Sequence, residues 1–444
     1  IRDVAVTGVQ TCALPILNPW VGTRTFSQVN DIPNWKDFDP RFGLSYDLFG
    51  NNRTALKFSI GRYVAKTNVD VATLLNPNTT SVNTARRAWN DNFYPVGDAR
   101  RGNFYPDCLL TNPLAQNNSA TGGDVCGQIS NLNLGKPIPT TTYADDVLHD
   151  NRGSNWQGAV SMQQELVPGM ALNVGYYRTW YSNMSVSTNS ALTPADFDSY
   201  CITAPTDTRL GSASGQRICG LVDVKPAKFG QVSDLITQSS NFGKQTEHFN
   251  GIDVTVNARP TDALLLQGGV STGRTSTDNC EVAAKVPEVL FGMTAFGTAN
   301  NNVWTPLDYC KQQTPFLTQV KMIGSYTVPK VGVQLSSTFQ SLPGPLVFAN
   351  WAVPGAVAAS ALGRPLSANA ANIQVNVLEP GSIYGERASW LDFRVGKILR
   401  FGRVRSTVNL DLFNSLNANP VLVQNNVFGG TTPWQAPQSI LIAR

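Results

Sequence analysis

The chain has 444 residues, a formal net charge of +4 and only 14% charged residues, against about 25% in ordinary soluble domains. The small charge and the lack of a basic cluster in the sequence argue against nucleic acid as a partner. No apolar run reaches the roughly 18 to 20 residues of a membrane helix, which excludes a helical membrane protein. A transmembrane barrel is still allowed, because its strands need only about 9 to 11 residues.

The beginning of the chain is set apart from the rest. Residues 6–16 read VTGVQTCALPI, which resembles the translation of a common sequencing-adapter oligonucleotide at every position. We interpret residues 1–16 as an adapter-derived artefact and exclude them from fold reasoning. The alternative is a short apolar strand. We expect residues 17–444 to carry the fold.

The first predicted element is a hairpin over residues 39–64. Phe42, Leu44 and Tyr46 alternate with polar or small residues, and Leu56 and Phe58 do the same further along. Side chains of a strand alternate between its two faces, so each half is a strand with one apolar and one polar face. The Gly-Asn-Asn sequence at 50–52 predicts a tight turn between them, because Gly and Asn tolerate positive φ.

The same unit recurs four more times along the chain. The predicted turns lie at 167–170, 259–262, 329–330 and 401–403, each between two alternating strands. A last strand is predicted from Gln438, which gives about eleven strands in total. Long connections separate the hairpins, at roughly 65–152, 185–247, 275–313 and 342–386. We expect these connections to be loops without regular structure.

Strict alternation between short turns and very long loops predicts an antiparallel transmembrane β-barrel, in which short turns lie on one side and long loops on the other. Such loops are uncommon in compact soluble domains. Aromatic residues near strand ends, such as Tyr46, Trp180 and Phe401, suit the interfacial girdles. The polar faces carry the neighbours Asp392/Arg394 and the pair Arg405/Asp411, which we expect to face a wet lumen. A soluble β-sandwich or solenoid is the alternative, although no repeat of 20 to 50 residues is present.

Cysteine spacing predicts disulfide-stapled loops. Without Cys12, six cysteines remain, and they fall into three pairs, each within one long loop: Cys108 and Cys126, Cys201 and Cys219, Cys280 and Cys310. Six cysteines allow fifteen pairings, and locality favours these three. An even count in polar loops indicates an oxidising compartment. Zinc is a weaker interpretation, because there is no Cys-x-x-Cys and only two histidines.

The first long loop carries the candidate site residues. Exposed aromatic residues near polar groups mark recognition surfaces, so we name as candidate ligand contacts Trp89, Phe93, Tyr94, Phe104 and Tyr105. Carboxylate and amide oxygens suit calcium, and the candidate ligands are Asp91, Asn92, Asn103 and Asp107. Their spacing matches no EF-hand, and the alternative is that the loop packs on itself. No other cofactor is expected.

Three segments, at residues 35–50, 408–417 and 434–440, resemble TonB-dependent outer-membrane receptors. The first of them is closest to the Oar-like branch, whose members often carry a carboxypeptidase-regulatory-like domain. Residues 35–50 (WKDFDPRFGLSYDLFG) resemble the entry to a mid-barrel hairpin of these receptors, and residues 408–417 (VNLDLFNSLN) resemble their penultimate strand. Residues 434–440 (WQAPQSI) resemble the entry to their last strand. The family's plug domain and TonB box have no counterpart in the sequence, and Arg444 stands where the family usually ends in an aromatic residue.

The resemblance implies the C-terminal part of a barrel of about 22 strands, truncated at both ends, in the outer membrane of a Gram-negative bacterium. It implies outer-membrane lipid around the barrel and TonB-energised uptake of a scarce small molecule, peptide or oligosaccharide, with the TonB complex acting through the missing plug. A passive porin or adhesin-like barrel and a secreted glycan-binding β-protein are the alternatives. The sequence has no enzyme signature, such as a phosphate loop or a Gly-x-Ser-x-Gly motif, so an enzyme is not expected.

Overall fold

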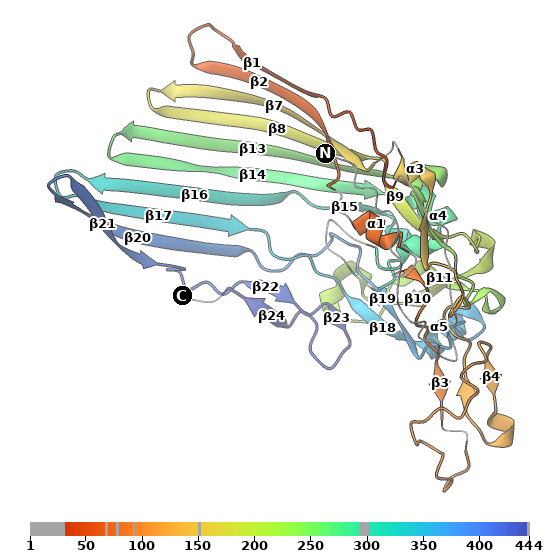
Figure 1. Ribbon diagram of the computed structural model, residues 1–444. Coiled ribbons are helices and arrows are strands. Elements are labelled where there is room, and N and C mark those ends of the chain that lie inside the picture. The colour runs from red at the N-terminus through yellow and green to blue at the C-terminus, as the bar shows by residue number, and fades with distance from the viewer. Residues whose placement is uncertain are drawn as a thin grey trace.

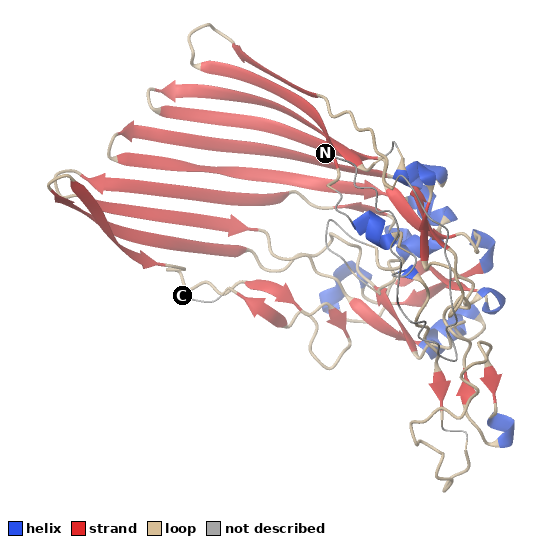
Figure 2. Cartoon of the chain, viewed as in Figure 1, coloured by secondary structure: helices blue, strands red, loops and turns tan. Residues whose placement is uncertain are grey.

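One long antiparallel sheet dominates the structure (Figures 1 and 2). The computed structural model describes residues 32–66, 70–76, 80–91, 94–149, 152–293, 300 and 302–441. Ten strands pair in chain order: β1 (Arg41–Asp47), β2 (Thr54–Val64), β7 (Ser154–Val167), β8 (Met170–Ser182), β13 (Thr246–Thr261), β14 (Leu264–Asp278), β16 (Leu317–Val328), β17 (Val333–Leu342), β20 (Ala388–Phe401) and β21 (Val404–Leu412). Short β15 (Lys311–Gln313) also pairs with β14. The predicted antiparallel β fold and all five predicted hairpins are confirmed.

The register of the sheet keeps the apolar residues of neighbouring strands in rows on one face. Phe58 pairs with Leu44 of β1 and with Val160 of β7, and Val254 pairs with Val174 and Val270. Because the side-chain period of a strand is two, these pairings place the alternating apolar residues of every strand on the same side. The face remains open to the surroundings: Phe42 is 59% exposed and Leu410 is 73% exposed.

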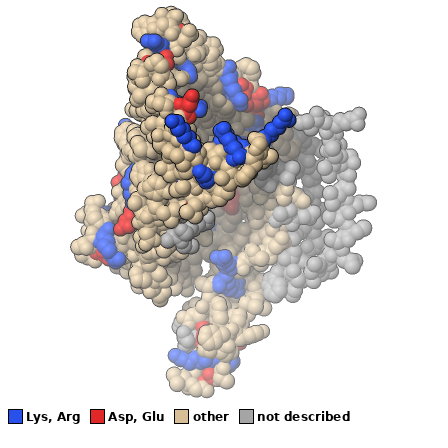
Figure 3. All heavy atoms as spheres, turned by 90° about the vertical axis from the view of Figure 1, so that its left-hand side faces the viewer, with Lys and Arg blue, Asp and Glu red and all other residues tan. Residues whose placement is uncertain are grey.

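Short turns close the hairpins at one end of the sheet, and the long loops gather at the other (Figure 1). Several turn residues have positive φ, among them Gly50 (67°), Asn52 (58°) and Lys330 (66°). Gly169 is the most constrained, because a Cβ there would lie 2.6 Å from the carbonyl oxygen of Arg259. The short-turn end carries exposed basic side chains (Figure 3), which include Arg53, Arg259, Lys330, Arg400, Arg403 and Arg405.

Aromatic rings on the polar face of the sheet lie across glycines. A Cβ on Gly273 would meet Cζ of Phe249 at 2.4 Å, and one on Gly251 would meet the same atom at 2.7 Å. Tyr177 covers Gly175 in the same way, with its hydroxyl 2.7 Å from the Cβ position. The missing side chains therefore leave the space in which the rings lie flat against the sheet.

The charged residues on the polar faces of β20 and β21 interact across the two strands. Arg394 and Asp411 lie directly opposite each other and form a two-pronged ion pair. Asp392 instead accepts a hydrogen bond from the backbone of Asn414 at 2.7 Å. Arg405 lies opposite Arg400 rather than beside a carboxylate. Arg394 pairs with a residue of the opposite strand rather than with Asp392 of its own strand, because directly opposite residues lie closer than residues two apart on one strand.

The expectation that the long loops lack regular structure is wrong. The described short strands in them are β3 (Trp89–Asn90), β4 (Gln116–Asn117), β5 (Val125–Cys126), β6 (Thr141–Tyr143), β9 (Ser185–Asn189), β10 (Phe197–Thr203), β11 (Arg217–Val224), β12 (Asp234–Gln238), β18 (Asn350–Pro354) and β19 (Asn372–Asn376). Three more short strands follow β21: β22 (Val421–Gln424), β23 (Val427–Phe428) and β24 (Pro437–Ile440). The α-helices among the described residues are α1 (Asp70–Leu74), α3 (Asp145–Leu148), α4 (Cys280–Lys285) and α5 (Gly355–Leu362). The 3-10 turns in the described part of the chain are η1 (Ser119–Thr121), η2 (Pro194–Asp196), η3 (Thr208–Ala213), η4 (Pro226–Lys228), η5 (Ser239–Asn241), η6 (Pro287–Leu290) and η7 (Leu307–Tyr309).

The last predicted strand forms, but it does not extend the large sheet. Its counterpart β24 pairs with β22, with Val421 opposite Ile440. The eleventh strand of the large sheet is β15 instead. None of the described helices is both long enough and apolar enough to cross a membrane.

Candidate functional site

The long loops form a packed unit with its own hydrophobic core. We call this unit the loop assembly; it comprises the described residues of 183–245, 279–316, 343–387 and 413–441. Its fully buried side chains include Leu210 and Leu221 from one loop and Val353, Val375 and Val377 from another. Phe428 and Trp434 also belong to this core, where their rings pack edge to face with centroids 5.2 Å apart. Loops more than a hundred residues apart therefore share one core.

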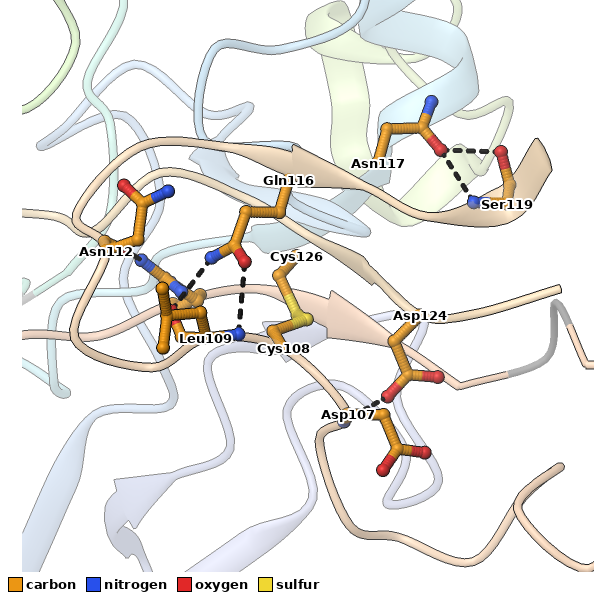
Figure 4. The surroundings of a disulfide bond; sticks show 10 residues. Asp107, Cys108, Leu109, Asn112, Gln116, Asn117, Ser119, Asp124 and Cys126 are labelled. Atoms are coloured by element: carbon orange, nitrogen blue, oxygen red, sulfur yellow. Dashed lines mark hydrogen bonds between the residues drawn. A yellow bond between two sulfur atoms is a disulfide. The ribbon is translucent and has the colours of Figure 1, made fainter. Parts of the chain in front are cut away.

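The three predicted disulfides are present, and each staples one loop. Cys201–Cys219 joins β10 to β11, and Cys280–Cys310 joins α4 to the end of η7. Cys108–Cys126 lies in the first long loop (Figure 4). Each pair closes a segment of 18 or 30 residues, so the bonds restrict the unfolded chain locally and leave the connection between loops to packing.

Arg364 ties two loops of the assembly together. Its guanidinium contacts Asp198 of β10 at 2.6 Å and Asp223 of β11 at 2.6 Å. Asp223 also accepts hydrogen bonds from the backbone and hydroxyl of Ser367. Burial alone lowers the pKa of Arg364, but its hydrogen bonds to Asp223 and Asp198 outweigh burial and raise that pKa. The cation therefore stays charged where it links the β10–β11 hairpin to the segment after α5.

The first long loop forms a separate projection, which we call the finger (described residues of 86–130; Figure 1). Strands β3, β4 and β5 build it, and its base is held to the loop assembly by a hydrogen bond from Gln128 to the carbonyl of Phe229 at 2.6 Å. Residues of the finger form hydrogen bonds with one another. As Figure 4 shows, the side-chain amide of Gln116 accepts a hydrogen bond from the backbone N–H of Leu109 and donates one to its carbonyl.

The candidate ligand contacts of the finger divide by exposure. Phe104 and Tyr105 are 86% and 69% exposed, and Trp89 is also exposed. Tyr94 is 7% exposed, and the guanidinium of Arg100 lies 4.2 Å from its ring centroid. Phe93 lies outside the described residues. The structure therefore brings aromatic surface to the finger, and ligand contact there stays a prediction.

The candidate calcium ligands mostly bond to backbone groups of the finger. Asp91 accepts a hydrogen bond from the backbone of Phe104 at 2.9 Å, and Asn103 accepts one from that of Tyr105 at 2.8 Å. Asp107 lies beside Asp124, whose carboxylate accepts the Asp107 backbone N–H at 2.8 Å (Figure 4). Asn92 lies outside the described residues. The described part of the chain contains no group of three or more His, Cys, Asp or Glu side chains arranged to hold a metal, and calcium stays a prediction.

A cleft of about 1050 Å3 lies where the long loops meet the start of β7 and the end of β8. Strands β6, β9, β12 and β13, helices α1, α3 and α4 and turn η6 supply further parts of its walls. Its described lining includes three carboxylates, Asp234, Glu247 and Glu288, and we call it the acidic cleft. Glu288 is fixed by hydrogen bonds from the hydroxyl of Thr188 at 3.1 Å and the backbone of Asn189 at 2.7 Å.

The environment of Asp234 in the acidic cleft disfavours its charge. Burial, and then the neighbouring carboxylate of Glu288, raise the pKa of Asp234 above its ordinary value. Two carboxylates in one partly dry site repel each other, and each is stabilised when a cation enters. Perturbed carboxylates in a cleft are a recognised sign of a functional site.

Comparison with known proteins gives matches among solved structures but none by sequence. No protein-family model matches the chain, and no curated protein matches it in sequence. Among solved structures, the chain is similar to the outer membrane transporter YddB from Escherichia coli, with 10% identity and a TM-score of 0.41 over 87% of this chain and 38% of that one. It is also similar to a chain of the FpvAI–pyocin S2 complex, with 9% identity and a TM-score of 0.38 over 92% of this chain and 32% of that one.

The chain thus spans 38% and 32% of the two proteins it matches. Similarity at this level establishes neither a shared family nor a shared function. The assignment of fold rests on the pairing and faces of the strands themselves.

Sequence reasoning did not find the acidic cleft. Its carboxylates lie on β12, on β13 and in η6, and each stands alone in its own segment. The one local signal is Glu247, which shares the polar face of β13 with Asp253 and Thr255. No spacing rule connects the three positions, because the loops that carry them meet only in the folded chain.

Proposed function

We propose that this chain forms part of the barrel of an outer-membrane receptor of the TonB-dependent, Oar-like type, which takes up a scarce ligand with energy delivered through TonB. The observation that carries the proposal is the sheet. Its apolar face exposes large side chains on every strand, among them Phe42, Val254 and Leu410. Water-soluble proteins rarely leave so continuous an apolar face open, whereas hydrocarbon requires one.

The two ends of the sheet support the direction of the proposal. Short turns at one end and disulfide-stapled loops at the other match the periplasmic and extracellular sides of an outer-membrane barrel. The loop assembly and its acidic cleft would then meet a ligand outside the cell. Transport is proposed rather than catalysis because the cleft combines carboxylates with aromatic rings, as a ligand-binding site does.

The first experiment deletes the gene of this protein in its host and measures uptake of candidate ligands by wild-type and deleted cells. Active transport predicts uptake that is lost on deletion, lost equally in a tonB-deleted strain and lost on adding a protonophore. Uptake that needs the gene but survives both energy treatments would favour the passive porin. Recovery of the protein in the soluble fraction without detergent would contradict a membrane location altogether.

A further inference from the structure

We propose that the acidic cleft binds an organic cation, a ligand that carries protonated amines on an apolar or aromatic body. This inference rests on the proposed function, since it names the class of ligand that the receptor would capture. The cleft has about 1050 Å3 of space, which suits a ligand of drug size or somewhat larger. Its described lining offers three features that point to the same ligand chemistry.

The first feature is the charge of the lining. Asp234, Glu247 and Glu288 are its carboxylates, and Arg152 is the only cationic side chain among the described lining residues. Arg152 is already neutralised, because its guanidinium contacts Asp37 at 2.7 Å and lies 4.9 Å from the ring centroid of Trp35. Within the described part of the chain, no ion pair involves any of the three carboxylates. A cationic ligand would supply the missing counter-charge.

The second feature is a buried hydrogen-bond acceptor without a donor. Asn279 lines the cleft and is only 9% exposed. Its Oδ1 atom has no hydrogen-bond partner among the described residues, whereas its Nδ2 atom donates to the sulfur of Met293 at 3.4 Å. A buried acceptor without a donor costs free energy until a donor arrives. An ammonium group has three N–H donors and no acceptor, so it fits this position.

The third feature is the aromatic content of the walls. Trp35, Tyr143, Tyr181 and Phe291 all line the cleft. Aromatic rings attract cations over their faces and also pack against apolar ligand parts. A cleft that combines carboxylates with aromatic rings therefore recognises both ends of an amine with an apolar body.

A bare metal ion fits the cleft less well. Metal binding needs several hard ligands converging on one point, and the described residues form no such group. An anionic ligand is disfavoured because it would face three carboxylates across a partly dry cleft. The chemistry of the lining thus favours an organic cation over both.

The test uses dansyl-spermine, a fluorescent polyamine with an aromatic body, and its fully N-acetylated analogue, which has no positive charge. Binding to the purified full chain in detergent is followed by fluorescence anisotropy at constant ionic strength. We expect the cation to bind at least about tenfold more tightly than the acetylated analogue, because charge-assisted hydrogen bonds are roughly twice as strong as neutral ones. Unlabelled spermidine should displace the probe, and NaCl at equal ionic strength should not. Equal binding of the two analogues would overturn the inference without any variant.

The variant pair Asp234→Asn and Glu247→Gln, made together, should weaken cation binding about tenfold or more and leave the acetylated analogue unaffected. The matched control is Glu165→Gln with Asp262→Asn, two carboxylates near the short-turn end that lie outside the cleft lining. Unchanged cation binding in the first pair would place the site elsewhere and overturn the inference. Cation binding without energised uptake would count against the proposed function alone, and energised uptake without cation binding would count against this inference alone.

Discussion

The sheet and the loop assembly follow opposite rules for the placement of apolar side chains. In the sheet, Leu410 is 73% exposed, and every strand turns its apolar residues outward. In the loop assembly, Val353, Val375 and Val377 are fully buried in a shared core. One chain therefore packs its apolar side chains in two different ways, and the two regions meet at the end of the sheet where the long loops begin.

The difference indicates which surroundings each region meets. Apolar side chains can remain exposed on the outside of a protein where the surroundings are themselves apolar. In water they are buried inside the protein instead. Each strand from β2 to β20 along the sheet pairs with a neighbour on both sides, which is how backbone groups are satisfied in hydrocarbon. The loop assembly satisfies its backbone with short strands, helices and side chains such as Arg364, as a water-soluble domain does. A change that damages one region should therefore leave the other intact.

The largest expected effect comes from a charge placed in the loop core. Val353→Asp puts a carboxylate at a fully buried position, where an unpaired charge costs several kcal/mol. We expect proteinase K to cleave the loops of this variant in reconstituted liposomes, while the sheet keeps its strand signal in circular dichroism. The control Val357→Asp makes the same change at a position on α5 that is 39% exposed and should remain resistant. Equal cleavage of the two variants would contradict a packed loop core.

The next effect is the removal of one disulfide. Replacing Cys201 and Cys219 by alanine should destabilise the loop assembly by about 3 kcal/mol, because the unfolded chain regains the freedom of a loop of this length. The measurement is the urea midpoint for protease resistance of the loops. Replacing Cys108 and Cys126 opens a loop of the same separation of 18 residues in the finger. That control should expose only the finger to protease, and cleavage throughout the loops would show that finger and loop assembly unfold together.

A change confined to the sheet sharpens the comparison from the other side. Gly273→Val places a side chain where Phe249 lies, since a Cβ there would meet Cζ of Phe249 at 2.4 Å. Overpacking of this kind costs about 1 to 3 kcal/mol, so the sheet should unfold at lower urea concentration with unchanged loop resistance at low urea. Gly43→Val is the control, because the nearest atom to its Cβ position is 4.0 Å away. A smaller loss at Gly273 than at Gly43 would refute the role of the ring over the glycine.

The smallest effect is a pH-dependent gain in stability. Burial and Glu288 raise the pKa of Asp234 in the folded protein, so the folded state holds this proton more tightly than the unfolded chain does. Stability is therefore lost as the pH rises from the ordinary Asp value of about 4 through the raised pKa, and the loss is constant above it. Asp234→Asn cannot lose this proton and so removes the loss. The Tm of the variant minus the Tm of wild type should therefore be larger at pH 7 than at pH 3. A difference in Tm that stays the same at both pH values would contradict the raised pKa.

The sequence by itself determined the features that depend on neighbours along the chain. The alternation around Phe42 and Leu56 defined both strands of the first hairpin, and the Gly and Asn residues at 50–52 located its turn. The disulfide pairs followed from locality, because each pair lies within one loop. The division into short turns and long loops was also visible in the spacing of the strands.

The tertiary structure decided the features that join distant segments. It paired Arg394 with Asp411 across two strands, directed β24 to β22, and built one core from loops that sequence analysis expected to be irregular. It also brought Asp234, Glu247 and Glu288 into one cleft. These contacts depend on how loops of tens of residues fold back on one another. Local periodicity carries no information about that step, because packing in three dimensions selects the partners.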